Sequence, residues 1–104
     1  MALFDLKKEA DSLPSAWRSR ILGHVGRANL KVLRMDGRPV PAEVHDYDEG
    51  LLVVDGVLEL SVAGERFTVR AGGLYVAKAG VEHTVEPGST GTLVIIDLPE
   101  VAAY

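Results

Sequence analysis

The stretch Pro41-Ala-Glu43-Val-His45-Asp-Tyr47-Asp-Glu49 decides the fold, because it places three potential metal ligands beside a strand signal. Glu43 and His45 are two residues apart, so on an extended chain both side chains leave the same face of a sheet. A turn or bulge at 46–48 would return Glu49 to that face. His83 could join from a later paired strand, and four nitrogen and oxygen ligands would then converge.

These residue types predict one divalent ion rather than a thiolate site, since the chain has no cysteine. Imidazole and carboxylate ligands suit Fe, Mn, Ni, Co or Zn. Two His with one carboxylate would leave open positions for a substrate or dioxygen. Glu43 would add a second carboxylate that offsets the charge of the ion. Ordinary polar surface residues are the alternative interpretation, because Glu-x-His also occurs by chance.

The rest of the chain reads as an antiparallel all-β domain. Short runs rich in Val, Leu and Ile, separated by Gly, Pro and Asp, predict strands at 18–25, 28–35, 50–54, 57–62, 66–70, 74–77, 82–86 and 91–98. Asp55-Gly56 between two such runs predicts a two-residue hairpin. Further turns are expected at 63–65 and 71–73.

About eight short strands favour a closed antiparallel β-barrel or a jelly roll, and the pattern alone does not separate these from an immunoglobulin-like sandwich. Before them, apolar residues at helical spacing predict a short amphipathic helix over 3–12, closed by Pro14. We therefore predict an N-terminal helical segment, 1–17, and a barrel domain, 18–104.

Two motifs resemble those of the cupin family. Glu43-x-His45-x-x-x-Glu49, with Gly56 beyond it, is similar to the first cupin motif, which has His-x-His, three residues, Glu, six residues and Gly. Gly72 followed by Lys78-Ala-Gly-Val-Glu-His83 is similar to the second, which has Gly and then Pro-x-Gly-x-x-His. Together with the flanking strands, the resemblance covers most of the chain after Trp17.

The resemblance implies that His45, Glu49 and His83 bind the metal. Glu43 stands where the family has its first His, so it is a fourth ligand, a catalytic base or neither. Lys78 replaces the usual Pro of the second motif, and Pro87 stands where that motif often has Asn.

Other residues are candidates for the pocket rather than for the metal. Tyr47, Met35 and Tyr75 could bind substrate, although aromatic and Met side chains on strands more often belong to the core. His24 has no partner at metal-ligand spacing and is interpreted as a strand or subunit-contact residue.

Composition excludes several classes of function. The 104 residues suffice for one core, and the net charge of -4 with scattered Lys and Arg disfavours nucleic acid as a partner. No apolar stretch approaches the ~20 residues that cross a bilayer, and the first residues lack a secretory pattern, so we expect a cytoplasmic protein. The resemblance also implies a homodimer, with the segment from Trp17 to Val25 supplying an edge strand.

Two classes of function remain open. One is a metalloenzyme acting on a small polar molecule, with dioxygenase, isomerase or lyase chemistry. The alternative is a non-catalytic barrel that binds or senses a small ligand, and a structural barrel with a vestigial motif is a third possibility. The resemblance does not choose among them, because the cupin fold carries many activities.

Overall fold

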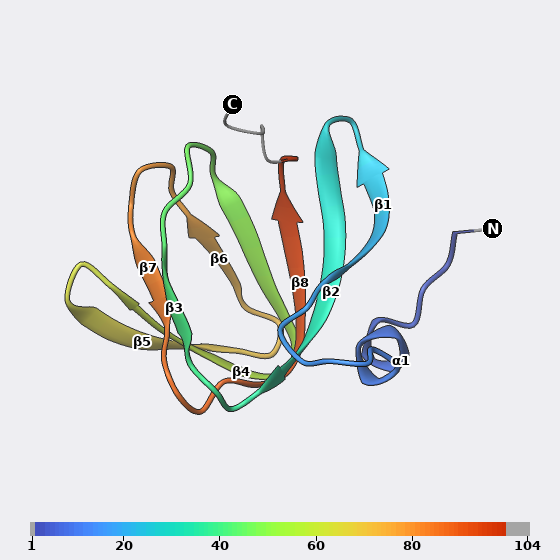
Figure 1. Ribbon diagram of the computed structural model, residues 1–104, viewed down its shortest axis with the longest axis horizontal. Helices are drawn as coiled ribbons and strands as arrows, with labels where there is room; N and C mark the ends of the chain where they lie inside the picture. Colours follow the sequence, from blue (N-terminus) through green and yellow to red (C-terminus); the bar gives the residue numbers. More distant parts are fainter. Residues whose placement is uncertain (1, 100–104) are drawn as a thin grey trace.

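The computed structural model describes residues 2–99, which form one short helix and a curled antiparallel sheet of eight strands (Figure 1). The elements are α1 (Leu6–Asp11), β1 (Arg20–Val25), β2 (Ala28–Asp36), β3 (Val40–Glu43), β4 (Glu49–Val62), β5 (Glu65–Arg70), β6 (Leu74–Ala77), β7 (His83–Val85) and β8 (Thr90–Asp97). The prediction of an antiparallel all-β fold with a short N-terminal helix is confirmed. Residues 100–104 of the predicted barrel domain lie outside the described residues.

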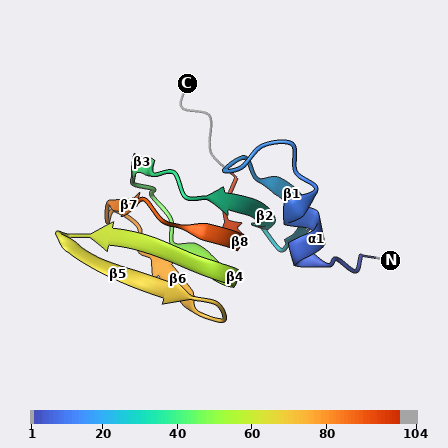
Figure 2. The same ribbon diagram turned by 90° about the horizontal axis from the view of Figure 1, so that it is seen from below.

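The long strand β4 organises the sheet. Neighbouring strands follow the order β1-β2-β8-β4-β7-β3, and β5 and β6 also pair with β4. The first half of β4 lies between β8 and β6, and its second half lies between β5 and β7. Because one strand takes part in both halves, the sheet curls into a half-barrel with a hollow inner face (Figures 1 and 2).

The predicted hairpin at Asp55-Gly56 is wrong, because β4 runs through it as one bent strand. Gly56 has a φ of 79° and faces Gly91 of β8, whose φ is 106°. A Cβ on Gly56 would lie 1.9 Å from the Thr90 carbonyl oxygen. The glycine signal therefore marks a bend and a close strand crossing, where only glycine fits. The predicted strands 50–54 and 57–62 are two halves of β4.

Several strand limits differ from the predictions by one or two residues, and one strand and the helix differ by more. β3 was absent from the predicted strands, because Val40-Pro-Ala-Glu43 contains a proline and lacks the aliphatic run that signals a strand. The helix is shorter than 3–12, since the Asp5 carboxylate caps it by accepting a hydrogen bond from the Lys8 N–H at 3.1 Å.

The outer face of β2 and β8 is closed by the helix. Ala10 of α1 is fully buried against Val32 and Val94. Arg34 donates hydrogen bonds to the carbonyls of Ala10 and Leu13, at 2.8 and 3.0 Å, which satisfies acceptors at the end of the helix. α1 is therefore a brace on the sheet.

The inner face carries the larger core. Its buried members are aliphatic or Met side chains from β2, β4 and β8: Leu33, Met35, Leu51, Val53, Leu58, Leu60 and Leu93. This core fills part of the half-barrel, and a cavity remains between the core and the candidate ligands.

Within residues 2–99, no helix has the length and apolar character needed to cross a membrane. β1 is an edge strand, and the homodimer through it stays a prediction, as does the domain boundary at residue 17.

Candidate metal centre

Two of the four candidate ligands are cross-strand neighbours. Glu43 ends β3 and pairs in register with His83, the first residue of β7. His83 also pairs with Val62 of β4, so it is held between two strands and its side chain is buried. Directly opposite residues of an antiparallel pair lie close together, which brings these two ligands to one place.

His45 lies two residues after the end of β3 and is held by a backbone hydrogen bond from the turn before β7. Its carbonyl accepts a hydrogen bond from the Gly80 N–H at 2.8 Å, and three residues later the Asp48 carboxylate accepts one from the Ala79 N–H at 2.9 Å. The turn between β6 and β7 is thereby fastened to residues 45–48. The bond from Ala79 holds the pKa of Asp48 below its usual range, with Lys78, 3.4 Å away, contributing less. Asp48 thus supports the loop and not an imidazole.

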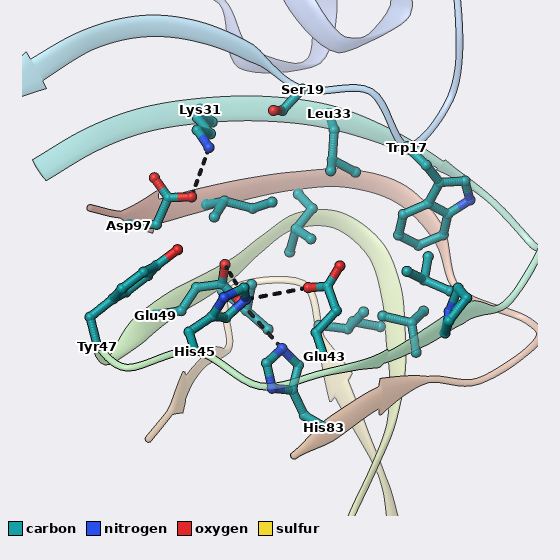
Figure 3. Close-up of a pocket in the computed structure, with 17 residues that line it drawn as sticks. Trp17, Ser19, Lys31, Leu33, Glu43, His45, Tyr47, Glu49, His83 and Asp97 are labelled. Carbon is teal, nitrogen blue, oxygen red and sulfur yellow. Dashed lines mark hydrogen bonds and ion pairs between the residues drawn. The ribbon is translucent and has the colours of Figure 1, made fainter. Parts of the chain in front are cut away.

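Glu49 opens β4 after the irregular stretch 44–48, as the predicted turn or bulge requires. It shares a strand face with Leu51 and Val53, so its carboxylate lies at the end of the inner core. The structure brings together all four residues that the sequence singled out (Figure 3).

The ligand atoms converge at distances suited to one ion. The ring nitrogens and carboxylate oxygens of the four residues all lie within 4.8 Å of one another. Opposite ligands of one ion are separated by about 4.2 Å when the bonds are about 2.1 Å. The side chains are 49%, 18%, 8% and 5% exposed for Glu43, His45, Glu49 and His83, in that order. Glu43 therefore forms the open side of the cluster.

The donor set fits a cation. His45 Nε2 is buried and, among residues 2–99, has no hydrogen-bond partner, although oxygens of Glu43 and Glu49 lie 3.4 and 3.7 Å away. A neutral imidazole nitrogen and carboxylate oxygens all offer lone pairs. Electron-rich atoms turned toward one point need a metal ion or a proton between them.

A proton can compete with a metal ion for the position between these ligand atoms. His83 Nε2 lies 3.4 Å from Glu49, and the hydrogen bond to that carboxylate raises the pKa of His83 above its ordinary value, against the opposing effect of burial. Metal ligation requires the deprotonated imidazole. The same carboxylate that attracts a proton to His83 also attracts a divalent ion.

The cluster opens into a cavity of about 240 Å³ inside the half-barrel. Its walls combine aliphatic side chains, such as Leu33, Leu51, Leu93 and Ile95, with the polar residues of the cluster and of the opposite side, and Trp17 lies at one side (Figure 3). Pockets for drug-sized ligands span about 300–1,000 Å³. The cavity therefore suits a smaller molecule placed next to the cluster.

The three predicted pocket residues have different places. Tyr47 lines the cavity and stacks on His45, with ring centroids 5.0 Å apart. Met35 is buried within the inner core. Tyr75 packs against that core and against Phe67, with centroids 5.1 Å apart. Only Tyr47 of the three lies beside the cluster, and His24 is exposed on β1, away from it.

Sequence reasoning missed the polar residues of the opposite wall. Lys31 and Asp97 line the cavity and form an ion pair at 2.8 Å, and Asn29 donates to the other Asp97 oxygen at 3.0 Å. The sequence did hold a sign of them, because Asn29 and Lys31 share a strand face with the apolar Leu33, where further apolar residues would be expected.

Comparison with known families now places the fold. Residues 32–99 match the family described as Cupin domain. The match spans more than half of the chain and includes all four candidate ligands. The chain belongs to the cupin family. No curated protein matches it.

Solved structures share the same architecture. A cupin-2 domain containing protein from Shewanella frigidimarina has a TM-score of 0.86 at 22% identity, over 94% of this chain and 96% of that one. A protein from Neisseria meningitidis has a TM-score of 0.79 at 22% identity, over 93% and 99%. Hydroquinone 1,2-dioxygenase PnpCD, solved with Cd²⁺ and 4-hydroxybenzonitrile, has a TM-score of 0.78 at 14% identity, over 95% and 74%. At these identities the likeness establishes the fold alone.

Proposed function

We propose that this protein is a metalloenzyme that acts on a small polar molecule in the cavity of its half-barrel. One divalent ion would be held by His45, Glu49 and His83. The observation that carries the proposal is the unpartnered His45 nitrogen aimed, with two carboxylates, at one point beside an open cavity. A structural similarity to a dioxygenase that was solved with Cd²⁺ supports the same assignment.

The two histidines and Glu49 suit Fe, Mn, Ni, Co or Zn. When bound, such an ion would polarise an oxygen atom of the substrate. The largely buried side chains of His45, Glu49 and His83 keep this side of the site from water.

Glu43 is proposed as the general base. Its side chain is half exposed and stands at the open side of the cluster, so it can exchange a proton with the substrate and then with solvent. Its carboxylate lies 3.4 Å from His45 Nε2, which places it beside the reacting atoms. This role requires that Glu43 contributes less to metal binding than Glu49 does.

The experiment is elemental analysis of protein purified without an affinity tag, with two matched histidine variants. Wild type and His24→Ala, whose imidazole is exposed on β1, should hold about one ion per chain, and His45→Ala should hold less than about one tenth of that. Equal metal in both variants, or none in the wild type even after divalent ions are added, contradicts the metal site.

Assays for oxygen uptake and for isomerisation of small hydroxy and keto compounds then address the reaction. Turnover by the loaded wild type that disappears in Glu43→Gln, with the metal retained, supports the enzyme. Loaded protein that binds such compounds but converts none favours the alternative, a non-catalytic ligand-binding or sensor barrel.

A further inference from the structure

A polar group faces the metal centre from the opposite wall of the cavity (Figure 3). The Lys31 ammonium of β2 lies 2.8 Å from Asp97 of β8, and the second oxygen of Asp97 accepts a hydrogen bond from Asn29. The side chains of Lys31 and Asp97 are 22% and 7% exposed. Ser19 lies near Lys31, and aliphatic residues such as Leu33, Leu93 and Ile95 also line the cavity.

Lys31 does not behave as an ordinary solvated lysine. β2 lies between β1 and β8, and Lys31 shares the inner face of this strand with Leu33, so its side chain is directed to the cavity. The backbone ladder already pairs β2 with β8 from Asn29 to Asp36, so the register does not depend on the ion pair. A partly buried ion pair contributes little to stability by itself, because desolvation offsets the attraction.

The hydrogen-bonding capacity of the two partners differs. Each carboxylate oxygen of Asp97 has a donor, from Lys31 or from Asn29. An ammonium has three donors, and among residues 2–99 the contact recorded for the Lys31 ammonium is with Asp97. Because Lys31 lines the same cavity as the metal centre, the other donors of its ammonium are available to a ligand there.

We propose that Lys31, positioned by Asp97, is a specificity-determining residue that donates a hydrogen bond to a substrate oxygen far from the reacting end. The inference rests on the proposed function and names its substrate class. That class is a small molecule with one oxygen group at each end of an apolar middle. A cavity of about 150 Å³ holds benzene, so about 240 Å³ accommodates one ring with substituents at both ends.

The distal oxygen group belongs to a neutral hydroxyl or carbonyl. Asp97 neutralises Lys31, and Glu43 and Glu49 together neutralise a divalent ion. A second carboxylate at Lys31 would meet the negative charge of Asp97 in a poorly solvated place. A neutral acceptor takes the free donors without that repulsion.

The test uses three hydroxamates that anchor one end of the ligand to the metal. Benzohydroxamate, 4-hydroxybenzohydroxamate and 4-carboxybenzohydroxamate differ only in the group opposite the anchor. Their affinities for zinc-loaded protein are measured by isothermal titration calorimetry, and the zinc content of every sample is determined. In the wild type the 4-hydroxy probe should bind about tenfold more tightly than the parent, since hydrogen bonds to charged groups are the stronger kind. The 4-carboxy probe should gain less than the 4-hydroxy probe.

Three variants assign the effect to the ammonium. Lys31→Met removes it at nearly constant length, and Lys31→Met/Asp97→Asn removes it without leaving Asp97 charged and unpaired. Both should lose the preference for the 4-hydroxy probe and keep zinc and affinity for the parent. Lys7→Met, at an exposed lysine of α1 whose side chain is 60% exposed, should keep the preference.

Each contrary result points to a different failure. A preference that survives in both Lys31 variants overturns the role of Lys31, as does a wild type that binds the parent and gains nothing from the hydroxyl. A stronger gain from the 4-carboxy probe overturns the neutral class. Wild type that holds no zinc overturns the proposed metal site and this inference with it. Wild type that holds zinc and does not bind the parent leaves the metal site standing and overturns the ligand site beside it, and therefore this inference.

Discussion

The two faces of the strands β2, β4 and β8 differ in what they bury. Toward α1 the face is closed by apolar contacts among Ala10, Val32 and Val94, and its Arg34 is hydrogen-bonded to carbonyls at the end of the helix. Toward the cavity the same strands carry Glu49, and Lys31 faces it from β2. Buried carboxylates and an ion pair cost free energy that apolar contacts do not. The helix face therefore serves stability, whereas the cavity face gives up some stability to hold charged groups.

The largest effect is expected where β4 bends from one half of the sheet to the other, since both faces depend on that bend. Gly56→Ala would place a Cβ 1.9 Å from the Thr90 carbonyl oxygen at a φ of 79°. We expect a loss of roughly 3 kcal/mol or more in the free energy of unfolding, measured by urea denaturation. Gly64→Ala is the matched control, with a φ of 81° and no atom within 4 Å, and should cost about 1 kcal/mol. Equal losses would mean that the strand crossing is not tight.

The second-largest effect is a difference in metal affinity between variants of the two glutamates that line the cavity. Glu49→Gln should weaken metal binding by more than about 100-fold, because it removes a buried ligand, whereas Glu43→Gln should weaken it by about tenfold or less. Affinities are measured by competition with a chelating indicator. A larger loss in Glu43→Gln than in Glu49→Gln would make Glu43 a principal ligand and remove its proposed role as base.

A smaller effect belongs to the helix face. Val32→Ala should lower the free energy of unfolding by roughly 2 kcal/mol, while the metal content per folded chain stays unchanged. Val25→Ala, at an exposed position of β1, should change stability by no more than about 0.5 kcal/mol. Loss of metal in Val32→Ala would show that the two faces are not independent.

The smallest effect concerns pH at Asp36, which is hydrogen-bonded to the cavity residue Trp17. The Arg38 N–H, aided by the indole of Trp17 at 2.6 Å, holds the pKa of Asp36 below its ordinary value of 3.8. Asp36 therefore stabilises the fold above that ordinary value, and the contribution is lost as pH falls through the lowered pKa. Asp36→Asn should lose less stability than wild type between about pH 5 and pH 2 in urea titrations. Parallel pH profiles for the two proteins would contradict this.

The sequence predicted which candidate residues converge better than it predicted the strands around them. Spacing placed Glu43 and His45 on one face, and the cross-strand pairing with His83 confirms their convergence. The Asp55-Gly56 signal was misread, because a positive φ serves a bend as well as a hairpin, and only the Gly91 partner distinguishes the two. The sequence could not predict that Lys31 lines the cavity in an ion pair, since its partner Asp97 is 66 residues away in sequence.

The most direct test of the metal centre is X-ray absorption spectroscopy of the zinc-loaded protein, compared with His83→Ala. Two imidazole ligands and oxygen neighbours at about 2.0–2.2 Å are expected in the wild type. The variant should lose the bound zinc, or one imidazole from any residual zinc. A wild-type spectrum with no imidazole scattering, or an identical spectrum from His83→Ala at full zinc content, would contradict the proposed metal centre.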